Sequence, residues 1–161
     1  MGTAPFELIF EFPALSEDLE DAIAGCFDAL IATHSEVTTV TLSAEGDTCL
    51  LAASSAIDGL RTLGANPLRL VDDLVSRGEI ARRAGVTPQA VGLWIRGERH
   101  AGTAFPRRFV TAGGGLWLWA EVVPALAERG VAIDDGVQYP TRRDAQLIGA
   151  EIAAMSLATP T

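Results

Sequence analysis

Apolar and polar residues alternate at the start of the chain and then change to helical spacing. In residues 6–12, FELIFEF, phenylalanine or leucine fills every even position while Glu7 and Glu11 lie on the other side. This period of two predicts a half-buried strand. Ser16 then precedes three acidic residues and an apolar series at intervals of three and four that ends near Phe27, which predicts a capped helix.

The segments that follow predict a small module of strands and helices. Three short β-prone segments follow, at residues 29–32, 37–42 and 68–71. The first two are joined as a hairpin, and between the last two a helix begins at Asp47 or Thr48 and ends at Gly64. The order β-α-β-β-α-β predicts an α+β, ferredoxin-like module over residues 1–72. A β-α-β-α-β order is the alternative.

Residues 76–96, SRGEIARRAGVTPQAVGLWIR, have the spacing of a helix-turn-helix. The first helix has one apolar face, formed by Ile80, Ala81 and Ala84. Gly85 ends this helix, because a left-handed residue turns a chain sharply with little strain when it is glycine. Val86 is expected to fill the corner between the helices.

A second helix follows at once. Thr87 can cap its first turn, and Pro88 falls at the first helical position, where its missing N–H has no consequence. The apolar residues that return this helix to the core are Val91, Trp94 and Ile95. Packed helices without a nucleic-acid partner are the alternative interpretation.

A wing is predicted after these helices. We expect residues 97–109 to form a loop and residues 111–119 to form a strand with three glycines at a hairpin tip. A helix over residues 119–128 would close the domain by packing inward Trp119, Val122, Val123 and Leu126. Residues 73–130 are therefore predicted to be a winged helix-turn-helix DNA-binding domain.

Residues 131–161 are expected to form a linker and an amphipathic C-terminal helix over residues 141–157. The apolar face of this helix comprises Leu147, Ile148, Ile152, Ala153 and Met155. Such a helix is usually a packing or dimer element.

The distribution of charged residues along the chain places a basic segment in its middle. The 161 residues are 48% hydrophobic and carry a net charge of -9, which fits one domain or two small ones. Residues 1–73 hold 13 acidic residues and two arginines, residues 74–119 hold seven arginines against two glutamates, and residues 120–161 hold three arginines against six acids. A basic middle between acidic flanks is typical of a nucleic-acid module.

The run DLVSRGEIARRAGVTPQAVGLWIRGERHAGTAFPRRF, followed by LWLWAEVVPAL, resembles helix-turn-helix DNA-binding proteins common in actinobacteria. Their architecture is similar to the winged helix of MerR and excisionase proteins. The resemblance covers residues 72–129, and it implies a DNA-binding protein, typically a transcriptional regulator. Leu93 and Leu118 stand where the family usually has polar or basic residues.

Candidate DNA contacts follow from the geometry of such a motif. The second helix offers Thr87, Gln89, Ala90, Gly92, Leu93 and Arg96 to the major groove. Gln89 is the expected base reader, because its amide can pair with adenine N6 and N7, whereas Thr87 either caps the helix or holds a phosphate. Backbone contacts are expected from Arg82 and Arg83 on the first helix and from Arg99, Arg107 and Arg108 in the wing. A solvated surface charge is the alternative for each arginine.

Other chemistry has little support in the sequence. Cys26 and Cys49 form no metal motif, and His34 and His100 are far apart without a nucleophile motif, so we expect no enzyme, no catalytic residue, no metal and no cofactor. No leader and no apolar run of about 20 residues occurs, which predicts a cytoplasmic protein without a membrane partner.

The sequence thus predicts a homodimeric transcriptional regulator that binds double-stranded DNA, with the acidic module available for self-association or for a protein partner. An excisionase-like protein that bends DNA is an alternative within the same class. A protein-interaction module whose helix-turn-helix binds no DNA is a second alternative, and a small-ligand sensor is a third.

Overall fold

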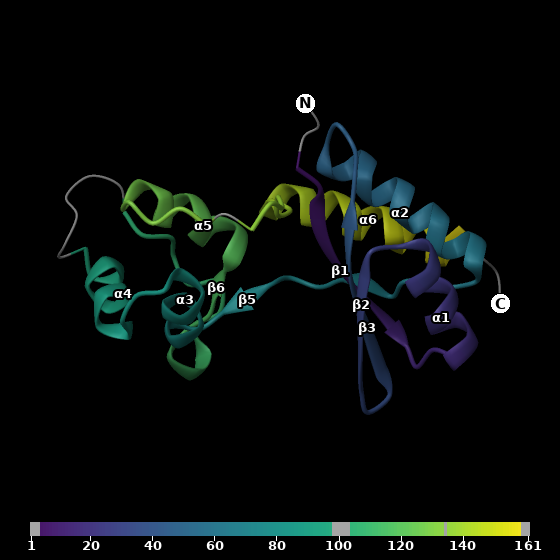
Figure 1. Ribbon diagram of the computed structural model, residues 1–161, viewed down its shortest axis with the longest axis horizontal. Coiled ribbons are helices and arrows are strands. Elements are labelled where there is room, and N and C mark those ends of the chain that lie inside the picture. Colours follow the sequence, from purple (N-terminus) through teal and green to yellow (C-terminus); the bar gives the residue numbers. More distant parts are fainter. Residues whose placement is uncertain (1–3, 98–103, 134, 159–161) are drawn as a thin grey trace. The chain divides into compact units, whose positions relative to one another are not determined.

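The structure is a computed structural model that describes residues 4–97, 104–133 and 135–158, and it divides into two compact units (Figure 1). Unit 1 comprises residues 1–72 and 136–161, and unit 2 comprises residues 73–135. The C-terminal helix, which the sequence pattern placed in a segment of its own with a linker, belongs to unit 1. The chain therefore leaves unit 1 once, forms unit 2, and returns.

Unit 1 contains a four-stranded antiparallel sheet. Its strands are β1 (Phe6–Pro13), β2 (Ala29–His34), β3 (Val37–Ala44) and β4 (Arg69–Leu70). They lie in the order β2-β3-β1-β4, and the central β1 pairs with β3 from Phe6↔Ala44 to Pro13↔Val37. The predicted α+β class is confirmed at this level.

Helices cover one face of this sheet. They are α1 (Glu17–Cys26), α2 (Cys49–Leu63) and α6 (Arg142–Ala158). Phe6, Leu8, Phe10 and Phe12 of β1 are buried in one hydrophobic cluster with residues of all three helices. The intervening residues of β1 are only partly buried. Alternation in the sequence thus decides which face of β1 meets the helices.

Local signals fix the ends of these elements. Ser16 and Thr48 cap α1 and α2 through side-chain oxygens, and α2 ends at Gly64, whose φ is 100°. The hairpin loop is shorter than the sequence suggested, since Thr33 and His34 pair with β3 and only Ser35 and Glu36 remain in the turn.

The C-terminal helix α6 is a packing element within unit 1. Ile148 and Ile152 are buried, Met155 is half-buried, and Leu147 and Ala153 are exposed, so the buried stripe is narrower than the predicted one. The hydroxyl of Ser54 on α2 lies within 2.9 Å of both carboxylate oxygens of Glu151. The helix therefore rests on α2 through both apolar and polar contacts.

Unit 2 is built from short elements. They are β5 (Leu74–Val75), α3 (Arg77–Ala84), α4 (Pro88–Ile95), a 3₁₀ turn η1 (Ala112–Gly114), β6 (Trp117–Leu118) and α5 (Trp119–Glu128). Strands β5 and β6 form an antiparallel pair. The unit encloses three buried tryptophans, together with Val75, Ile80, Val91, Val122 and Leu126. Val123, expected to point inward, is half-buried.

The predicted strand over residues 111–119 is largely wrong. The glycine run forms η1, in which Gly113 has a left-handed φ of 64°, and only Trp117 and Leu118 are in a strand. Their partner is β5, a segment that precedes the two helices of the motif. A bridge between Val110 and Leu116 closes the turn. Three consecutive glycines lack the side chains that stabilise an extended ladder, so they form a compact tip.

Candidate nucleic-acid interface

Helices α3 and α4 are joined by a sharp, fully capped turn. Ser76 accepts a hydrogen bond from Glu79 N at 3.2 Å, and Gly85 ends α3 with a φ of 68°. Thr87 then accepts from Ala90 N at 3.1 Å, and Pro88 is the first residue of α4. Ala81 of α3 is buried, and α3 and α4 contact each other. The local sequence thus determines the helix ends and the turn between them.

The first turn of α4 faces solvent. Thr87 and Gln89 are exposed, and Ala90 is half-buried. Thr87 is the helix cap, and its hydroxyl can still donate a hydrogen bond while its oxygen accepts one. Gln89 therefore has the position expected of a side chain that reaches outward from the start of a recognition helix.

The second half of α4 is less exposed than the sequence predicted. Gly92 is buried and Leu93 is half-buried, so the helix offers less outward surface there than its sequence spacing suggested. Arg96 is exposed at the C-cap. The apolar residue next to Gly92 is drawn toward the core because unit 2 is small and buries most apolar side chains available to it.

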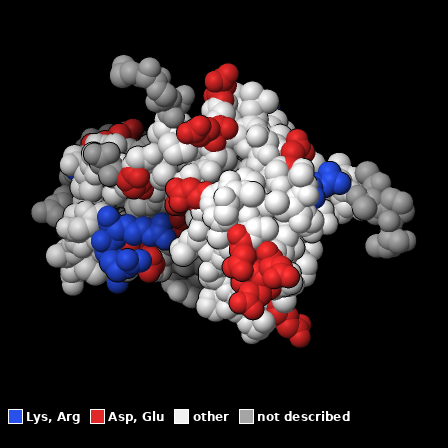
Figure 2. Space-filling model, turned by 45° about the vertical axis from the view of Figure 1, so that its right-hand side comes forward, with Lys and Arg blue, Asp and Glu red and all other residues white. Residues whose placement is uncertain are grey.

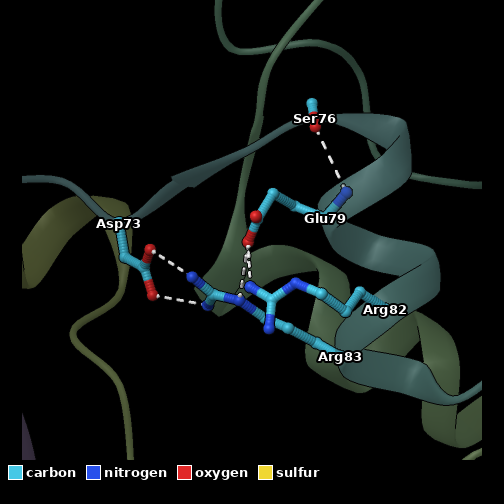
Figure 3. A network of polar contacts seen from close by, with 5 residues as sticks. All are labelled: Asp73, Ser76, Glu79, Arg82 and Arg83. Atoms are coloured by element: carbon cyan, nitrogen blue, oxygen red, sulfur yellow. Dashed lines mark hydrogen bonds and ion pairs between the residues drawn. The ribbon is translucent and has the colours of Figure 1, made fainter.

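The two arginines near the end of α3 have partners inside unit 2 (Figure 3). Arg82 donates to Glu79 at 2.7 Å and keeps 70% of its side chain exposed. Arg83 donates to both oxygens of Asp73, at 2.9 and 3.2 Å, and its guanidinium carbon lies 4.9 Å from the centre of the Trp119 ring. Arg83 thus ties the start of unit 2 to α3 and α5.

These arginines also set the ionisation of Glu79. The hydrogen bond from Arg82, together with the charges of Arg82 and Arg83, holds the pKa of Glu79 below its ordinary value. Glu79 therefore remains a carboxylate throughout the neutral range, and the three side chains form a stable charged network on the surface of α3.

The remaining basic candidates lie near the glycine turn. Arg107 and Arg108 are exposed, and the Arg108 guanidinium carbon lies 5.1 Å from the centre of the Trp117 ring. Trp117 is itself held by a hydrogen bond from its indole N–H to Pro106 O at 3.1 Å. Arg99 and His100 fall outside the described residues.

A cleft of about 520 Å³ lies in unit 2 between the start of α3, the end of α4 and the glycine turn. Three arginines line it, Arg77, Arg96 and Arg108. The described residues that line it include no carboxylate. From the sequence, Arg96 was expected to contact DNA from the second helix and Arg108 from the wing, whereas Arg77 was not among the candidates. Gly92 was expected to contact the groove itself, but a glycine inside a helix destabilises it by about 1 kcal/mol relative to alanine, and this signal could have pointed to side chains packed over that position.

Unit 1 carries most of the negative charge. In the view of Figure 2, acidic side chains are scattered over the surface, whereas most arginine side chains in view gather in one cluster. Arg69 of β4 is paired with Glu11 of β1, at 3.0 and 3.1 Å, and this hydrogen bond lowers the pKa of Glu11. Unit 1 thus offers an acidic surface and little cationic surface to a polyanion.

Three other kinds of feature can be compared with the structure: a metal site, a reactive thiol and a membrane-spanning helix. Within the described ranges no three His, Cys, Asp or Glu side chains group as a metal site would require. Burial raises the pKa of the Cys49 thiol to about 12, with the negative charge of Asp144 adding to the effect. Cys49 is thus a thiol rather than a thiolate nucleophile at neutral pH. In the described part of the chain, no helix has the length and apolar character to cross a bilayer.

Comparison of the chain with protein-family models, with curated proteins and with solved structures finds no match to any of them. The function proposed below therefore rests on the residues of unit 2 and on their geometry.

Proposed function

We propose that unit 2 binds double-stranded DNA through α3 and α4, with α4 as the recognition helix of a winged helix-turn-helix. The observation that carries this proposal is the pair of short, capped helices that are joined by a sharp turn at Gly85 and leave the first turn of α4 exposed at Thr87 and Gln89. A helix that enters the major groove by its N-terminal end needs such an exposed first turn.

Each part of the interface has a proposed role. Gln89 reads a base, since its amide can donate to and accept from adenine at the same time. The exposed arginines near the glycine turn, Arg107 and Arg108, hold the DNA backbone as the wing, and Arg82 adds charge from α3. Arg83 acts through the structure of unit 2, because its Nη1 and Nη2 already donate to Asp73 and its Nε lies 3.5 Å from a carboxylate oxygen of Glu79.

Unit 1 is proposed to be a ferredoxin-like module that serves association rather than DNA binding. Its strand order β2-β3-β1-β4 with antiparallel pairs supports this arrangement. Its acidic surface repels a polyanion, so the whole protein is proposed to act as a homodimeric transcriptional regulator in which two copies of unit 2 contact DNA. The resemblance to actinobacterial helix-turn-helix proteins agrees with this role.

Fluorescence anisotropy tests the proposal directly. The full chain is titrated onto the duplex upstream of its own gene and onto a scrambled duplex, at about 50 and 200 mM salt. With four to six phosphate contacts, the logarithm of the association constant should fall against the logarithm of salt with a slope of about -4 to -5. Gln89→Ala should reduce the preference between the duplexes by about 1–3 kcal/mol.

The matched control is Gln146→Ala, which removes an exposed glutamine of α6 in unit 1 and should leave both affinities unchanged. Absence of binding to either duplex at the lower salt would overturn the proposal and favour a protein-interaction role. Binding accompanied by a DNA bend would assign the excisionase-like role instead of simple operator reading.

A further inference from the structure

The cleft of unit 2 has the composition of an anion site. Its arginines come from three different segments: Arg77 begins α3, Arg96 caps α4, and Arg108 precedes the glycine turn. We propose that this cleft binds a phosphate group. The proposal rests on the DNA-binding function for the source of that phosphate, which would be one in the backbone of the duplex.

Gly92 brings two of the arginines together. A β-carbon at Gly92 would lie 3.3 Å from Arg96 Nη1 and 3.5 Å from Arg77 Nη1. Both guanidinium groups therefore lie over the same small area of α4, where any larger residue would intrude between them. The two guanidinium groups thus present positive charge to the same part of the cleft, where one anion could contact both.

The third arginine is positioned by stacking. Arg108 lies over the Trp117 ring, and its side chain also packs on Gly115, where a β-carbon would overlap it. Gly115 has a φ of 100°, so the same residue supplies the turn conformation and the space for Arg108. Stacking on an indole orients a guanidinium and leaves its N–H groups available at the edges.

The donors in the cleft match a phosphate group. Guanidinium groups bind phosphate oxygens with two parallel N–H bonds, and their charge does not depend on pH in the physiological range. The backbone N–H groups of Arg77 and Gly78 add two more donors. The first hydrogen bond within α3 runs from Ile80 N to Ser76 O, so these two backbone groups have no acceptor in the helix. Among the described lining residues only Ile95 and Trp117 are large and apolar, which disfavours an apolar ligand.

The experiment compares four variants of the full chain with the wild type. Arg77→Gln removes one cation from the cleft, and it should weaken duplex binding about tenfold and make the salt slope shallower by about one. Gly92→Ala changes no charge and adds one methyl group to the lining of the cleft, so a loss of affinity in this variant reports the shape of the cleft rather than its charge. Arg143→Gln removes an exposed arginine of α6 in unit 1 and should bind like the wild type.

Folding and affinity are separated by thermal unfolding. Because alanine favours a helix more than glycine does, Gly92→Ala should unfold at the same temperature as the wild type or a higher one. Weaker duplex binding by a protein that is at least as stable supports the cleft. Arg77→Lys restores the charge without the planar fork and should recover part of the lost affinity.

A second arm separates the two sources of phosphate. Pyrophosphate is added to the wild type and to Arg77→Gln without DNA, and the melting temperature is followed. If no duplex binds but pyrophosphate stabilises only the wild type, the cleft proposal holds and the DNA function fails. If the duplex binds all variants equally and pyrophosphate has no effect, the cleft proposal fails and the DNA function stands. If neither the duplex nor pyrophosphate binds, both the cleft proposal and the DNA-binding proposal are overturned.

Discussion

Arg82 and Arg83 are neighbours on α3 with identical charge and very different surroundings. Arg82 has a single acidic partner, Glu79, and extends into solvent. The side chain of Arg83 is only 30% exposed, bonds both oxygens of Asp73 and stacks on Trp119. A bidentate, partly buried pair is worth more than an exposed one, because less water competes for the same groups.

We predict that Arg83→Ala destabilises unit 2 by about 1–2 kcal/mol, the combined worth of a charge-assisted pair and a cation–π contact. Arg82→Ala, the matched control, should change stability by less than about 0.5 kcal/mol. Urea unfolding followed by tryptophan fluorescence measures both, because all three tryptophans lie in unit 2. Equal midpoints for the two variants would contradict the structural role of Arg83.

At the scale of the element, α6 shows how a terminal helix completes a core. Its first turn has a capping box, in which Asp144 N donates to the Thr141 hydroxyl at 3.1 Å and Thr141 N donates to Asp144 at 2.9 Å. Its buried stripe then reaches α2 and β4 through Ile148 and Ile152. Unit 1 therefore depends on a segment that follows unit 2 in the chain.

We predict that Ile152→Ala destabilises unit 1 by about 2–4 kcal/mol, since it leaves a cavity in the core. Leu147→Ala, on the same helix but 41% exposed, should cost less than about 1 kcal/mol. Thiol labelling of Cys49 in a Cys26→Ser background reports the unfolding of unit 1, because burial protects Cys49 and raises its pKa. Labelling of Cys49 at the same urea concentration in both variants would exclude this packing role of α6.

At the scale of the whole molecule, charge is divided unequally between the units. Unit 2 has eight arginines against seven acids, a net charge of +1, and unit 1 has four arginines against 14 acids, a net charge of -10. The proposed attraction to DNA therefore depends on the local arrangement of arginines rather than on a strongly basic domain.

We predict that residues 73–135 fold when produced alone, because the unit has its own core around three buried tryptophans. Circular dichroism should show a cooperative thermal transition, and the tryptophan emission should match that of the full chain. The complementary protein, with residues 73–135 replaced by a short flexible linker, should protect Cys49 as the full chain does. A fragment without a cooperative transition would show that unit 2 needs unit 1 to fold.

The sequence alone determined the features that depend on near neighbours. Helix ends at Ser16, Thr48, Gly85 and Thr87 could be predicted because a cap involves residues only two to four positions apart. The buried face of β1 followed from a period of two, for the same local reason. The two short helices α3 and α4 and the exposure of Gln89 followed likewise.

Only the tertiary structure decided which distant residues meet. It paired β6 with β5 across the whole motif, placed α6 in the core of unit 1, and turned Arg83 toward Asp73. It also brought Arg77, Arg96 and Arg108 to one cleft over Gly92 and Gly115. These arrangements depend on packing between segments far apart in the chain, where local propensity and spacing carry no information about the partner.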